Sequence, residues 1–189
     1  MNQRIRCAVL CLLVVMAGTR QVMASPDQPF IVESVNSRLN ETVYFLNAVF
    51  TISLPEHIVS AVDQGFDLPL VMEIEAFQRK SMWFDEKIVF IKQQYRVGYH
   101  TLLDEFSVFD VNSGIRRYYQ SLDKAMESLT VLMDYPAIDK NTLTSGTRYA
   151  LRLRFGVDGA ELPLPLKSSS LWRKKWNIKS EWFKWELQP

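Results

Sequence analysis

The chain has 189 residues, of which 48% are hydrophobic and 23% charged, a balance typical of a folded globular protein. Its formal net charge at pH 7 is +1, and the charge of about −2 that cleavage of a signal peptide would leave excludes a global attraction to nucleic acid or anionic lipid. It has no low-complexity tract, no block of like charge and no repeat period, so its length favours one domain.

The first 24 residues have the pattern of a secretory signal peptide. A basic start without acidic residues precedes an apolar run over 7–18, and small residues precede a predicted cleavage after Ala24. The apolar run is shorter than the ~20 residues that a membrane-spanning helix needs, and a retained anchor is the alternative. Cleavage would leave 25–189 as a single domain that is periplasmic or secreted, or peripherally associated with a membrane.

Cleavage would change the cysteine content and the net charge of the chain. It would remove both cysteines, Cys7 and Cys11, and with them any disulfide, thiolate nucleophile or thiolate ligand. It would also remove three arginines, leaving 19 basic against 21 acidic residues and a charge of about −2. We therefore expect no nucleic-acid partner and, after cleavage, no transmembrane helix.

The first strand and the first helix follow each other along the chain. Apolar residues with a period of two over 42–54 predict a strand with one buried face. The segment 53–65 then predicts a helix, with Ser53 and Glu56 as a capping box and Gly65 at its C-terminal end.

Two strands should follow this helix. Period two returns over 67–78, where we expect Glu73 and Glu75 to point away from the core. The segment 87–101 is long for one strand, and we expect a bulge at 93–94.

A hairpin and a second helix are predicted next. The turn residues "VNSG" at 111–114 separate two short strands. The segment 121–133 predicts a helix that Ser121 caps and Pro136 terminates. Its expected buried stripe is Leu122, Ala125, Met126, Leu129, Leu132 and Met133.

The last third of the chain reads as strands. Alternation over 147–159 puts Arg148, Arg152 and Arg154 on the face opposite the apolar residues. The segment 171–187 holds four of the five tryptophans, mainly at period two, and predicts a terminal hairpin whose aromatics close the core. Together the elements predict a β-rich α+β domain, in which a mostly antiparallel sheet or a small sandwich is packed by two short helices.

Four motifs follow one another along the chain: "LPLVMEIE" (68–75), "WFDEK" (83–87), "QYRVGY" (94–99) and "WNIKSEWFKWEL" (176–187). In these motifs and their order, the sequence resembles the DUF4390 family of uncharacterised proteobacterial envelope proteins. It implies an envelope location and makes the tail part of the domain. It supplies no catalytic residues.

Catalytic and metal chemistry find little support. Neither His57 nor His100 has a second ligand at the spacing of a zinc motif, and no P-loop or GxSxG motif is present. We therefore expect no metal, no cofactor and no enzymatic activity. A hydrolase acting through paired carboxylates such as Glu73 and Glu75 is a weaker alternative.

Aromatic and basic side chains supply the binding candidates. The segment 82–87, with Trp83 and Asp85, could form an aromatic–acid rim for a partner or plug the core. The segment 172–176 could place Trp172 in a membrane belt.

Three arginines form a basic ridge that could bind an anion or a lipid headgroup, or pair with glutamates on a neighbouring strand. The candidate residues are therefore Trp83, Asp85, Arg148, Arg152, Arg154 and Trp172. The sequence favours an exported, non-enzymatic domain that binds a protein partner or an envelope component. The alternative is a carrier of a lipid or small apolar ligand in a β-rich cavity.

Overall fold

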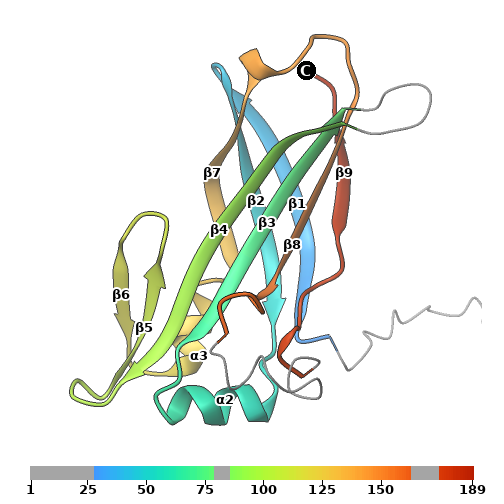
Figure 1. Cartoon of the computed structure of the whole chain (residues 1–189). Helices are drawn as coiled ribbons and strands as arrows, with labels where there is room; N and C mark the ends of the chain where they lie inside the picture. The colour runs from blue at the N-terminus through green and yellow to red at the C-terminus, as the bar shows by residue number, and fades with distance from the viewer. Residues whose placement is uncertain (1–27, 79–85, 163–174) are drawn as a thin grey trace, which may run out of the picture.

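A computed structural model describes residues 28–78, 86–162 and 175–189, and Figure 1 draws the fold. These residues form two antiparallel sheets, two short α-helices and one 3-10 turn. The predicted β-rich α+β fold is confirmed, and the sheets form a sandwich. The predicted signal peptide, 1–24, lies outside the described residues.

The first sheet has three strands in the order β1–β2–β7, which span Phe30–Asn40, Val43–Ile52 and Val131–Asp139. The second has six strands in the order β6–β5–β4–β3–β8–β9, which span Arg116–Tyr119, Glu105–Asp110, Glu86–His100, Leu68–Gln78, Tyr149–Val157 and Phe183–Leu187. In Figure 1 the three-stranded sheet lies behind the long strands β3, β4 and β8. Helices α2 (Glu56–Asp63) and α3 (Leu122–Glu127) lie at one end, and η1 (Lys140–Thr142) lies at the other.

The core fills the space between the two sheets. Alternate residues of β2, and of β8 up to Phe155, are buried as their period of two predicts, whereas β3 is buried almost throughout Leu68–Ala76. The ring of Phe155 on β8 meets Phe30 of β1 at 5.6 Å and Phe50 of β2 at 5.2 Å, measured between centroids. These contacts join the sheets through one hydrophobic cluster.

Helix α2 buries Ile58 and Val62 against the core, and Gly65 follows its end with a φ of +87°. The predicted capping box is wrong, because Pro55 occupies the N-cap and no side chain caps the helix.

The second helix is shorter than predicted. Ser121 caps α3 as expected, accepting a hydrogen bond from the Lys124 N–H, but the helix ends at Glu127. The chain then enters β7, where the side chain of Met133 is 74% exposed. Pairing of β7 with β2 outweighs the local helical pattern. Pro136 is tolerated within β7 because this strand is an edge of its sheet.

Two further predictions are corrected by strand pairing. Strand β4 pairs with β3 without a shift at 93–94, and the irregularity lies between Ala76 and Phe77 instead. Within the described part of the tail, 175–189, no terminal hairpin forms. Strand β9 pairs with β8, and Lys179 bridges separately to Gly156 of β8. The expected closure of the core does hold for Trp176, which is 2% exposed.

Candidate functional site

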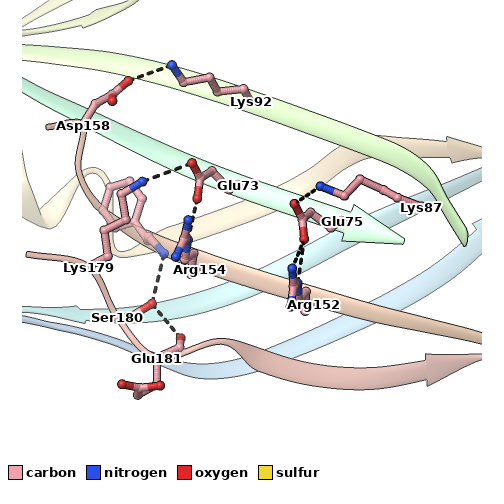
Figure 2. Close-up of polar contacts among 11 residues, drawn as sticks. Glu73, Glu75, Lys87, Lys92, Arg152, Arg154, Asp158, Lys179, Ser180 and Glu181 are labelled. Atoms are coloured by element: carbon pink, nitrogen blue, oxygen red, sulfur yellow. Dashed lines mark hydrogen bonds and ion pairs between the residues drawn. The ribbon is translucent and has the colours of Figure 1, made fainter. Parts of the chain in front are cut away.

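The face of the six-stranded sheet that points away from the core carries a cluster of ion pairs. Strand β3 puts Glu73 and Glu75 on this outer face, and the register of β8 sets Arg154 opposite Glu73 and Arg152 opposite Glu75. Figure 2 shows each guanidinium directed at its carboxylate. Arg152 donates from Nε to Glu75 Oε2 at 2.6 Å, and Arg154 donates from Nε to Glu73 Oε2. The predicted cross-strand pairing of these arginines is therefore present.

Each glutamate also binds a lysine from another element. Lys87 of β4 donates to Glu75 Oε1 at 2.6 Å, and Lys179, which precedes β9, donates to Glu73 Oε1 at 3.1 Å. We call the six residues Glu73, Glu75, Lys87, Arg152, Arg154 and Lys179 the ion-pair ladder. It contains four cations and two carboxylates, so it carries an excess of two positive charges.

The two carboxylates are less solvated than the alternation of β3 predicts. They point away from the core as expected, but the side chains of Glu73 and Glu75 are only 12% and 7% exposed. The indole of Trp182 lies over both guanidinium groups, 4.3 Å from Arg152 and 4.2 Å from Arg154. These outward-facing carboxylates are therefore shielded from solvent, because cations and an indole cover them.

The cations decide the charge state of these carboxyl groups. Burial alone raises the pKa of Glu73 and Glu75, but hydrogen bonds and charge from two cations each outweigh it. The pKa of each carboxyl therefore lies below its ordinary value of 4.5. Because the unfolded chain takes up these protons at a higher pH, the stability they contribute is complete above pH 4.5. It is lost as the pH falls through the lower pKa of the folded state.

The variant Glu75→Gln tests this account of the ladder. We expect it to lower the free energy of unfolding at neutral pH by about 1–3 kcal/mol, because Lys87 and Arg152 lose a charged acceptor. Its stability should also decline less than that of the wild type on acidification. Urea unfolding followed by circular dichroism, from neutral pH to about pH 3, measures both effects. Glu127→Gln on α3 is the matched control, because its pair with Lys124 is exposed. Equal acid profiles for wild type and Glu75→Gln would contradict the account.

A hollow of 520 Å³ adjoins the ladder on the same face. Its described lining comes from β3, β8 and β9: Phe77, Ala150, Leu151, Arg152, Lys184, Trp185 and Glu186. Arg152 belongs both to the ladder and to this lining, so charge and hollow form one continuous surface.

The two histidines lie apart from the ladder. His57 on α2 sets its ring edge-on to Trp176, with centroids 5.7 Å apart. At the end of β4, the His100 Nε2 lies 2.8 Å from Ser107 Oγ, to which Arg116 also donates at 2.9 Å. Among the residues that the structure describes, no three His, Cys, Asp or Glu side chains gather as they would around a metal ion.

The comparisons with known proteins give one match. The model of the DUF4390 family, a domain of unknown function, matches residues 27–186. This chain belongs to the DUF4390 family. No curated protein and no solved structure matches the chain.

The match to DUF4390 includes every residue of the ladder and of the hollow. It also includes the sequence-predicted candidates, which the structure distributes unevenly. Arg152 and Arg154 lie in the ladder, whereas Arg148 is exposed just before β8 and joins no ion pair with another described residue. Trp83, Asp85 and Trp172 fall outside the described residues.

Sequence reasoning missed three members of this DUF4390 surface. Lys87 comes from the next strand, β4, and Lys179 and Trp182 come from the tail, and only the pairing of strands brings them to Glu73, Glu75 and the arginines. The predicted closure of the core by the aromatics of the tail does not hold for Trp182, whose indole lies over the arginines of the outer face. Within the described ranges, the helices are all too short to cross a membrane.

Proposed function

We propose that this DUF4390 protein is an exported, non-enzymatic binding module that holds an acidic protein partner of the cell envelope. The binding surface is the outer face of the six-stranded sheet, centred on the ladder. The observation that carries the proposal is the excess of two positive charges around two buried carboxylates. The N-terminal pattern, which predicts export, supports a periplasmic or secreted location.

The chemistry of the ladder fits recognition of acidic groups. Complementary charge speeds association and selects partners, and a local excess does so even when the whole chain is nearly neutral. Arginine and tryptophan are also the residue types that most often dominate interface energies. Here Arg152, Arg154 and Trp182 form one stacked group.

The alternative of a lipid carrier needs an internal cavity. The rings of Phe30, Phe50 and Phe155 pack between the two sheets, which favours a surface site over an interior one. The carrier hypothesis stays a prediction, and it expects lipid to co-purify with the protein.

A neutralised ladder tests the proposed docking surface. The double variant Lys87→Gln and Lys179→Gln removes the excess charge, yet each glutamate keeps its arginine. We expect recovery of the partner from native envelopes to fall about tenfold, since about 1.4 kcal/mol of binding energy is a modest loss for two charge contacts. Mass spectrometry of co-purified proteins and lipids measures the recovery.

The matched control for this experiment is the double variant Lys124→Gln and Lys140→Gln. It makes the same charge change at exposed lysines on α3 and η1, away from the ladder. Equal recovery by the two double variants would overturn the docking surface. Recovery of lipid in place of protein would favour the carrier. N-terminal sequencing of the same sample should begin at Ser25 if the signal peptide is cleaved.

A further inference from the structure

We infer that the hollow beside Arg152 binds small amphipathic anions, in which a carboxylate or phosphate is joined to an apolar body. The inference rests on the proposed binding role of this sheet face and adds a ligand to it. The hollow exists because a small side chain sits among larger ones. Ala150 of β8 faces outward, opposite Phe77 of β3 on one side and Glu186 of β9 on the other.

The size and the walls of the hollow suit a small ligand. Its volume of 520 Å³ falls within the range of about 300–1,000 Å³ that is typical of small-molecule sites. Phe77 and Ala150 supply outward-facing apolar lining, against which a hydrocarbon or aromatic body would be removed from water.

One end of the hollow is cationic. Arg152 and Lys184 are cross-strand partners on β8 and β9, so their side chains lie next to each other on the outer face. Arg152 uses Nε and Nη2 on Glu75, which leaves further N–H donors of its guanidinium. Lys184 is exposed and forms no ion pair or hydrogen bond with another described residue. An anionic head therefore has two cationic groups to contact there.

Two walls flank Ala150 in the hollow. Phe77 of β3 forms one wall, and Glu186 of β9 forms the other. The Lys87 ammonium lies 5.8 Å and the Arg152 guanidinium 4.8 Å from the ring of Phe77, which makes that wall both apolar and electropositive. We expect the anionic head at the pair Arg152–Lys184 and the apolar body over Ala150.

A titration with three probes of equal chain length tests the site. Decanoate, decyl phosphate and decanol are added, below micelle formation, to the isotope-labelled exported protein, and amide shifts are recorded by NMR. We expect saturable shifts at Ala150, Arg152 and Lys184 with both anions, and about tenfold weaker binding of decanol. The tighter of the two anions distinguishes a fatty-acid source from a phosphate source. Equal binding of decanol would overturn the inference.

Two variants locate the binding. Ala150→Leu should fill the hollow and weaken decanoate about tenfold, and Lys184→Gln should weaken the anions but not decanol. Lys124→Gln on α3 is the matched control and should leave all three affinities unchanged. Circular dichroism verifies that each variant is folded. Unchanged affinity for decanoate in folded Ala150→Leu would place the binding elsewhere and refute the site.

The outcomes separate this inference from the docking proposal. The Lys87→Gln and Lys179→Gln variant keeps Arg152 and Lys184, so it should still bind decanoate. Loss of the protein partner with decanoate binding intact supports both ideas. If the anions bind but no partner depends on the ladder, the ligand site in the hollow is supported and the docking surface is refuted. A ladder-dependent partner without anion binding refutes the hollow alone.

Discussion

Replacing Trp176 with alanine should lower the free energy of unfolding by about 3–5 kcal/mol, the cost typical of truncating a buried aromatic side chain. The indole is 2% exposed and joins the tail to α2 and the loop after it. Its ring centroid lies 5.5 Å from that of Phe66 and 5.7 Å from that of His57. Its Nε1 has no hydrogen-bond partner among the described residues, so the loss comes from packing and from the cavity left behind.

Chemical denaturation of both proteins, followed by circular dichroism, measures the difference. Trp182→Ala is the matched control, because it removes the same side chain from the same segment but from the outer face. Its loss should be about 1 kcal/mol, the size of its contacts with two guanidinium groups. If the two variants were equally stable, Trp176 would not be part of the closing core.

Gly156→Ala should detach the segment before β9 from β8. A β-carbon at this position would lie 2.4 Å from the carbonyl oxygen of Ile178 and 2.5 Å from the Cα of Lys179. Both are backbone atoms, which cannot move aside as the end of a side chain can. The segment is held there by the Val157 N–H, which donates to the Ile178 oxygen at 2.8 Å, and by the Ser180 N–H, which donates to the Phe155 oxygen at 2.8 Å.

We expect this clash to cost about 1–3 kcal/mol or to free the segment, with faster amide exchange at Ser180 and along β9. Hydrogen exchange and urea unfolding measure the two effects. Gly159→Ala is the matched control, because its β-carbon would meet only the Asn177 side chain, at 3.4 Å. That variant should stay within about 0.5 kcal/mol of the wild type. Similar exchange in both variants would show that this close backbone contact does not hold the tail.

Burying the carboxylates of the ladder carries a desolvation cost that reduces what the ion pairs contribute to the stability of the sheet. Carboxylates removed from water must recover their hydration energy from partners, and apolar residues of similar size often serve stability as well. Four cations around Glu73 and Glu75 exceed what neutralisation requires. This excess is why we assign the ladder to binding in addition to folding.

The period of two in β2, β3 and β8 determined from sequence alone which residues face the core, because alternation is a local property of an extended chain. It also placed Glu73, Glu75, Arg152 and Arg154 on outward faces, and the order of motifs indicated the family. Local pattern failed where strand pairing competed with it. The residues after Glu127 read as helix but form β7, because β2 offers them a partner strand.

Only the tertiary structure decided which side chains contact one another. The pairing of β3 with β8 brings together residues about eighty positions apart, and Lys179 reaches Glu73 from the far end of the chain. The burial of the two carboxylates, the close contact at Gly156 and the hollow over Ala150 all depend on such distant neighbours. The local sequence determines which face of a strand each side chain lies on. Which residue it contacts depends on the register between strands that are distant in the sequence.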